Sequence, residues 1–130
     1  MSSIEHISGT AGEVSVPGAP IMNFTLAIFI GPLINGKPPV GLVSGHIEIG
    51  QAVHPGHPIA SSVTGQSYAV GGRQVIVFTG QYAVSLPPPA IGEIEQKISA
   101  VLVLESRTGG HGSFTYGGHS VVDVPVVLKH

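Results

Sequence analysis

The sequence predicts an all-β protein: a single antiparallel domain of about eight strands that forms a barrel or a half-closed meander. Three observations predict this class. Helical periodicity is nearly absent, 19 glycines and 11 prolines divide the chain into short runs rich in Val, Ile and Thr, and two Gly-Gly pairs each join two such runs. Because 130 residues can bury a core of their own, we expect one domain that spans 1–130.

The first Gly-Gly pair, at 71–72, predicts a long hairpin over 59–84. A two-residue primed turn needs positive φ, which glycine adopts without steric cost. With this turn as the whole loop, Gly65 faces Phe78, whose ring can cover the bare backbone of a strand glycine. The same register gives four further pairs: Val70 with Arg73, Tyr68 with Val75, Gln66 with Val77, and Thr64 with Thr79.

Another Gly-Gly pair, at 117–118, predicts a hairpin between 112–116 and 119–128, with Phe114 opposite Val121. Pro125 lies inside the second of these runs. Because proline has no backbone N–H, it indicates either a sheet edge or a bulge at this point.

The N-terminal part of the chain predicts three further strands. We expect a first, broken strand at 3–8 and 12–16. The run 21–30 is apolar on both faces, which is typical of a strand in the centre of a sheet. A third strand is expected at 40–53, because apolar and polar side chains alternate there.

The segment 93–105 also alternates with the period of a strand, but Ile94, Lys97 and Ile98 fit a helical stripe as well. Two valines within 101–103 favour the strand over the helix.

The choice between architectures depends on glycine and proline positions. Gly45, Gly65 and Gly80 lie where long strands would have to bend, which favours strong coiling or closure of the sheet. Pro125 favours at least one open edge. A two-sheet β-sandwich is therefore the alternative to the barrel.

Scarce charge limits the classes of partner. Only 9% of the residues are charged and the five Lys and Arg residues are scattered, so we expect no nucleic-acid binding. The absence of cysteine excludes disulfides and thiolate metal sites. No apolar run reaches the roughly 18 residues of a transmembrane helix, and no secretory signal begins the chain. Cytoplasmic residence is the default, with secretion by a signal-independent route as the alternative.

Four residues suggest a metal site. His54 and His57 lie three residues apart in one loop, and His46 and Glu48 share a face of the strand before it. Imidazole and carboxylate groups together are ligands that first-row metals use. A Pro-Gly turn with solvent-facing histidines explains the same residues. We expect no catalytic residue and no cofactor beyond this set, because the chain has a single Asp, no Cys and no nucleophile-elbow motif.

An aromatic-and-amide surface is a third possibility for function. Tyr68, Tyr82 and Tyr116, with Gln66 and Gln81, have side chains suited to contacts with a sugar or a peptide. The predicted hairpin register places Tyr68 and Tyr82 at opposite ends, which argues against one joint site.

Four short stretches share motifs with a known family. They are 18–26, 45–55, 79–80 and 122–126. The first two resemble the small-Pro-x-Leu-Asn-x-Thr-Leu and Gly-x-Ile-x-Gln-Ala-x-Asn-Pro-Pro patterns of a bacterial family known as a domain of unknown function (number 1842). His54 stands here for the Asn, and Gly56 for the second Pro. The resemblance implies one all-β domain and supplies no catalytic residue, cofactor or substrate.

Low charge beside a 42% hydrophobic content is typical of a neutral β protein that Ser, Thr, Gln, His and Gly keep soluble. The alternative is apolar surface that another protein, a second copy of the chain or a ligand covers. We therefore expect a non-enzymatic binding or interaction module that uses its apolar surface or a barrel cavity, with a homo-oligomer or a protein partner. The alternatives are a His-based metal protein or small barrel enzyme, and a surface or secreted domain that recognises glycans.

Overall fold

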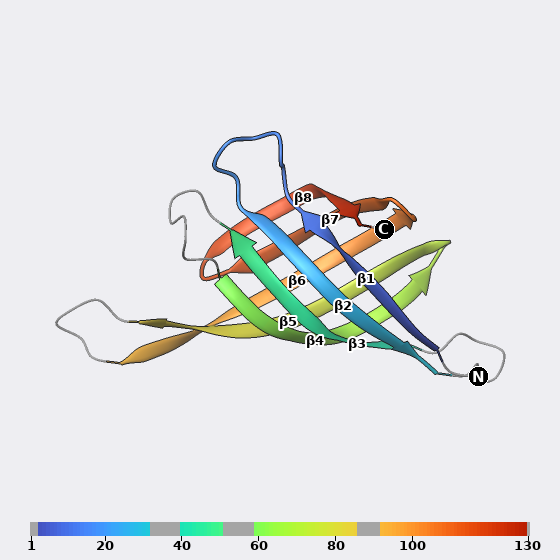
Figure 1. Cartoon of the computed structure of the whole chain (residues 1–130), viewed down its shortest axis with the longest axis horizontal. Coiled ribbons are helices and arrows are strands. Elements are labelled where there is room, and N and C mark those ends of the chain that lie inside the picture. The colour runs from blue at the N-terminus through green and yellow to red at the C-terminus, as the bar shows by residue number, and fades with distance from the viewer. Residues whose placement is uncertain (1–2, 32–39, 51–58, 86–91, 130) are drawn as a thin grey trace.

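The computed structural model describes residues 3–31, 40–50, 59–85 and 92–129, and this part of the chain forms eight β-strands and no helix. Each strand pairs antiparallel with the next along the chain, and β8 also pairs with β1, which closes the sheet into a barrel (Figure 1). The predicted all-β barrel is confirmed, and the sandwich alternative is wrong. The strands are β1 (Ser3–Ala11), β2 (Ile21–Ile30), β3 (Gly41–Gly50), β4 (Ile59–Val70), β5 (Arg73–Ser85), β6 (Glu93–Ser106), β7 (Gly109–Tyr116) and β8 (His119–Leu128).

Both Gly-Gly hairpins form with the predicted register. Gly71 and Gly72 have φ angles of 58° and 80°, as a primed two-residue turn requires. Gly65 pairs with Phe78, and the four other predicted pairs of this hairpin are present. In the second hairpin the predicted pair of Phe114 with Val121 is also present.

Inward-facing side chains fill the barrel. Because side chains alternate between the two faces of a strand, every second residue points into the core. Phe24, Phe78 and Phe114 are each exposed by 2% or less and contribute the largest volumes. In the described part of the chain the interior is therefore a packed core, and hollows lie on the outer surface and at the barrel ends.

Two mid-strand glycines allow the neighbouring strand to come unusually close. A Cβ on Gly65 would lie 1.8 Å from the carbonyl oxygen of Val77, and one on Gly45 would lie 2.2 Å from that of Thr25. Any larger residue would push the paired backbone away. The strands can therefore coil tightly at these points, as closure into a barrel demands.

One expectation about the N-terminal strands is wrong and one is confirmed. Residues 12–16 are not a strand: β1 ends at Ala11, and the Gly12 amide donates to the carbonyl of Pro125 at 3.0 Å. β2 pairs with β1 on one side and with β3 on the other, so its central place in the sheet is confirmed, although Phe29 on its outer face is 46% exposed. A closed barrel has one core, so each wall strand buries one face only.

The remaining strand predictions have mixed outcomes. The segment 93–105 forms β6, so the strand is confirmed and the helical alternative is wrong. The third predicted strand forms β3, and its last expected residues, 51–53, lie outside the described residues.

A bulge, one of the two predicted outcomes, lies two residues before Pro125, which itself pairs with His111. The register between β7 and β8 shifts at this bulge. Asp123 in this bulge has a φ of 54°, and its amide donates to the hydroxyl of Ser113 at 3.0 Å. The Ser113 hydroxyl thus accepts a hydrogen bond from a backbone N–H that has no partner in the ladder.

Candidate functional site

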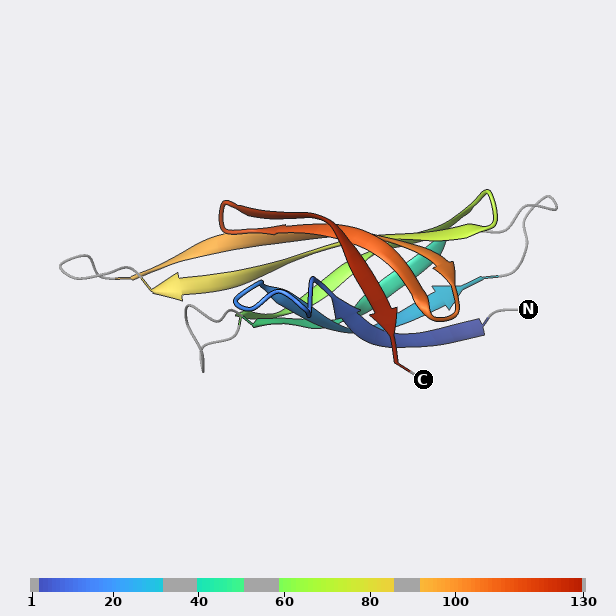
Figure 2. The ribbon, with the colours of Figure 1, turned by 90° about the horizontal axis from the view of Figure 1, so that it is seen from above.

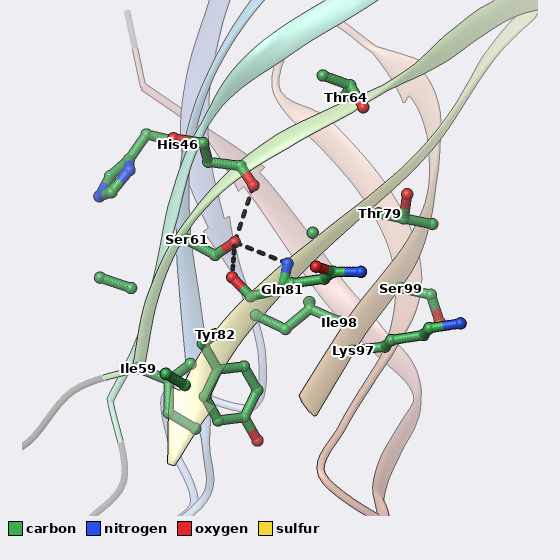
Figure 3. A pocket seen from close by; sticks show the side chains of 14 residues that line it. His46, Ile59, Ser61, Thr64, Thr79, Gln81, Tyr82, Lys97, Ile98 and Ser99 are labelled. Carbon is green, nitrogen blue, oxygen red and sulfur yellow. Dashed lines mark hydrogen bonds between the residues drawn. The ribbon is translucent and has the colours of Figure 1, made fainter. Parts of the chain in front are cut away.

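β4 and β5 separate in mid-strand. Their ladder ends at the pair of Val63 with Gly80. The hydroxyl oxygen of Ser61 lies in the gap, 2.8 Å from the carbonyl oxygens of Ser62 and Gln81, and accepts a hydrogen bond from the Gln81 amide at 3.1 Å (Figure 3). A Cβ on Gly80 would lie 2.6 Å from the Ser61 Oγ. Only glycine at position 80 therefore leaves room for the Ser61 hydroxyl. The hydrogen bonds of this hydroxyl to Gln81 stand where the next backbone hydrogen bonds between β4 and β5 would be.

Beyond this gap β5 and β6 continue as a two-stranded ribbon, which we call the arm: residues 81–85 and 93–97. In the described part of the chain these residues pair only with one another, because β7 joins β6 first at Ile98. Figure 1 and Figure 2 show the arm projecting from the body of the barrel. A two-stranded ribbon alone is marginally stable in water, so this arm stands out in an otherwise closed sheet.

The direction of one amide fixes the directions of the others in the arm. The Gln81 amide faces β4, because it donates to Ser61. Alternate residues of a strand direct their backbone groups to the same side, so those of Ala83 and Ser85 also face β4. Glu95 pairs with Ala83, and its backbone groups therefore face away from β5. We call the backbone of Ala83 and Ser85 the β5 edge, and that of Glu95 the β6 edge.

An open hollow lies beside each of these edges. The hollow along β4 and β5 has a volume of about 1460 Å³, and the one along β6 and the β7–β8 turn about 530 Å³. On β5 the hollow is lined by the uncharged Gln81, Tyr82 and Ala83. On β6 the smaller hollow is lined by Glu95 and Lys97, and Lys97 also reaches the larger one. The β5 edge is therefore both the roomier and the less charged of the two.

Aromatic rings hold the base of the arm. Tyr82 is half-buried, and a Cβ on Gly117 in the β7–β8 turn would lie 2.5 Å from its hydroxyl oxygen. Tyr116 is buried, with its ring centre 6.0 Å from that of Phe114 and 5.2 Å from that of His119. Burial raises the pKa of Tyr82, and burial followed by the nearby Tyr82 raises the pKa of Tyr116. Both phenols are therefore neutral at ordinary pH.

Hydroxyl side chains form a continuous row across the outer face. Each pairs in register with the next, from β3 to β8, and all are exposed. The sequence predicted the contact between Thr64 and Thr79, and the predicted pair of Phe114 with Val121 implies that of Thr115 with Ser120. The remaining contacts join strands that no Gly-Gly turn connects, so sequence reasoning missed them. This hydroxyl row consists of Ser44, Thr64, Thr79, Ser99, Thr115 and Ser120.

The predicted metal ligands are only partly placed. His46 and Glu48 lie on the outer, exposed face of β3, as expected. His54 and His57 lie outside the described residues. Among the residues that the structure describes, no three or more His, Cys, Asp or Glu side chains gather into a group that could hold a metal ion. The four-residue metal site stays a prediction.

The predicted separation of the hairpin tyrosines is confirmed. Tyr82 lines the large hollow beside the arm, whereas Tyr68 lines a hollow of about 680 Å³ at the other end of the hairpin. Apolar side chains from several strands, including Ile7, Ile30 and Leu128, line this second hollow. The tyrosines therefore do not form one joint aromatic surface.

No protein-family model matches the chain, and a search of curated proteins found no match to it. The resemblance to a domain of unknown function therefore stays a prediction. The fold defines a class, a closed antiparallel barrel of eight strands with a projecting arm. None of the described residues belongs to a helix that is long and apolar enough to cross a bilayer.

Proposed function

We propose that this protein is a non-enzymatic interaction module that binds an extended polypeptide by strand addition at the β5 edge. One observation carries the proposal. In the described part of the chain, the backbone groups of Ala83 and Ser85 have no strand partner on the side away from β6, and Ala83 lines an open hollow there. Exposed edges of this kind are templates for an additional strand.

The energetics of the arm support binding. Each backbone hydrogen bond to an added strand contributes about 0.5–1.5 kcal/mol. A third strand also converts a marginal ribbon into a sheet of the size that is stable in water. Natural proteins protect free edges with charge, and of the two edges it is the β6 edge that carries Glu95.

The chemistry around the gap supports binding over catalysis. A serine nucleophile needs a general base within hydrogen-bonding reach. The Ser61 hydroxyl, which is buried, bonds instead to backbone atoms of Ser62 and Gln81. Its role is to hold the two strands apart at a fixed spacing, which positions the edge beyond it.

A peptide selection tests the proposal. Linear peptides from a display library are selected on the wild-type protein, and their affinities are then measured on Ala83→Pro and Glu95→Pro. Because proline removes an N–H, Ala83→Pro deletes a donor of the β5 edge, and Glu95→Pro deletes the matching donor of the β6 edge. We expect the selected peptides to lose about two- to ten-fold in affinity on Ala83→Pro only. Equal affinity for both variants, or no selected peptides at all, contradicts strand addition at the β5 edge.

Glycan recognition is a second candidate, and the hydroxyl row favours it. Thr64, Thr79 and Ser99 of that row line the large hollow together with Gln81 and Lys97. Such groups can donate to and accept from the many hydroxyls of a sugar. A glycan array probed with the wild-type protein and with Thr79→Val tests this candidate. A binding signal that is weaker for the variant supports it, and an array without signals contradicts it.

A further inference from the structure

We infer that the strand added at the β5 edge is β5 of a second copy of this chain, so that two arms pair antiparallel around a two-fold axis at Val84. This inference rests on the proposed function and names its partner. Identical strands that pair antiparallel are related by a two-fold axis, the commonest symmetry of protein dimers.

The free backbone groups select one register. With the axis at Val84, Ala83 of each copy lies opposite Ser85 of the other, and both residues direct N–H and C=O toward the partner strand. These two pairs exchange four hydrogen bonds and use the groups of the β5 edge in full.

The two neighbours of the edge confine the ladder to this register. On one side the Gln81 amide is already bound to Ser61. On the other side the sequence continues to Pro87, which has no N–H to donate. Neither Gln81 on one side nor Pro87 on the other can therefore offer a further N–H to the ladder.

Space and charge favour the β5 edge over the β6 edge for self-pairing. A partner strand at the β5 edge enters the hollow of about 1460 Å³ between the arm and β4, where the strands have already separated. At the β6 edge the β7–β8 turn lies beside Lys97 and leaves about 530 Å³. The outward side chain of Ala83 is small and uncharged, and the net charge of −2 causes little repulsion between copies.

The first experiment is light scattering across a range of protein concentrations. We expect a reversible dimer for the wild type, and a dissociation constant about ten-fold or more higher for Ala83→Pro, which removes one donor from each copy. Glu95→Pro, at the same level of the ribbon, is expected to dimerise like the wild type. Far-UV circular dichroism shows whether each variant keeps the barrel.

A second experiment does not depend on the proline variants folding. The chain contains no cysteine, so Val84→Cys introduces a single thiol on the proposed axis. Residues opposite each other in a non-hydrogen-bonded pair have Cα atoms about 4.5 Å apart, which falls within disulfide geometry. We expect Val84→Cys to oxidise to a covalent dimer and Ile94→Cys, at its partner position across the ribbon on β6, to stay mainly reduced.

The outcomes separate this inference from the proposed function. A wild type that is monomeric at every concentration overturns the inference, and so does a dimer that Glu95→Pro dissociates and Ala83→Pro does not. If the wild type is monomeric but selected peptides still depend on Ala83, strand addition stands and only the second copy is wrong. If the peptides also fail, both are wrong.

Discussion

The longest and the shortest ladders of this barrel lie in regions with different roles. β5 and β6 share twelve residue pairs, whereas β8 and β1, which close the barrel, share three. Of the twelve pairs, the five between 81–85 and 93–97 lie in the arm. Two backbone bonds flank the closure, from Gly12 to Pro125 at 3.0 Å and from Lys129 to Ser8 at 2.8 Å. The chain thus continues pairing where no core requires it and closes the barrel with few pairs.

This difference teaches that pairing and burial are separate sources of order in the molecule. The short closure contains Ala11 paired with Val126, and their exposures are 0% and 2%, so side-chain packing supports it. The arm has many backbone bonds and a half-buried Tyr82 at its base. Regions that have few buried contacts open most easily, and binding elements are drawn from them.

The largest effect is expected from a change that breaks the closure. Gly9 pairs with Leu128, and a Cβ there would lie 2.2 Å from the carbonyl oxygen of Val127. Because backbone atoms cannot move aside cheaply, we expect Gly9→Ala to lower the free energy of unfolding by about 1–3 kcal/mol. Urea denaturation measures this change.

Gly50→Ala is the matched control for this prediction. Gly50 also lies in a strand, and a Cβ there would meet nothing within 4 Å. We expect its free energy of unfolding to change by no more than about 0.5 kcal/mol. If Gly9→Ala and Gly50→Ala lowered the free energy of unfolding equally, the β1–β8 closure would be no more sensitive to an added Cβ than another strand position.

The two regions also differ in how far the sequence predicted them. The pairs next to the two hairpin turns were predicted to the residue, because a two-residue Gly-Gly turn fixes the partners of both strands as far as the gap at Gly80 in one hairpin and the bulge at Asp123 in the other. The pairing of β1 with β8 was not predicted, because these strands come from opposite ends of the sequence and no local signal links Gly9 to Leu128. The segment 12–16 was wrongly expected to be a strand, since its alternation has no neighbouring strand to pair with in the described part of the chain.

The candidate site was less predictable than the fold. Gly80 was recognised as a point where β5 bends, but its partner Ser61 is one of many serines and had no distinguishing signal in the sequence. The separation of β4 and β5 depends on where one hydroxyl lies in three dimensions. The metal hypothesis rests partly on His54 and His57, which the structure does not describe.

A pH dependence sharpens the comparison at the base of the arm. The pKa values of Tyr82 and Tyr116 are raised in the folded protein, mainly by burial. In the unfolded chain each phenol loses its proton near pH 10, while the folded protein still holds it. The unfolded state then binds fewer protons, so the free energy of unfolding falls as pH rises above 10.

Denaturant unfolding at a series of alkaline pH values measures this fall. Tyr116→Phe cannot ionise at this position and is expected to show a shallower decline than the wild type. Tyr68→Phe is the control, because Tyr68 lies at the far end of the hairpin from the arm. If Tyr68→Phe flattened the curve as much as Tyr116→Phe, burial at the base of the arm would not be the cause.

The smallest effect on stability is expected within the arm, at Ala83. The amide of Ala83 is part of the β5 edge and points away from β6. Ala83→Pro therefore removes no bond of the β5–β6 ladder and leaves the core intact. We expect the free energy of unfolding to change by about 0.5 kcal/mol or less when it is measured at low protein concentration, where a dimer has dissociated. Val84→Pro, one residue later, removes an amide that faces β6 and is expected to cost more. If the two prolines destabilised the protein equally, both amides would be ladder donors, and β5 would have no free edge at which a partner strand could add.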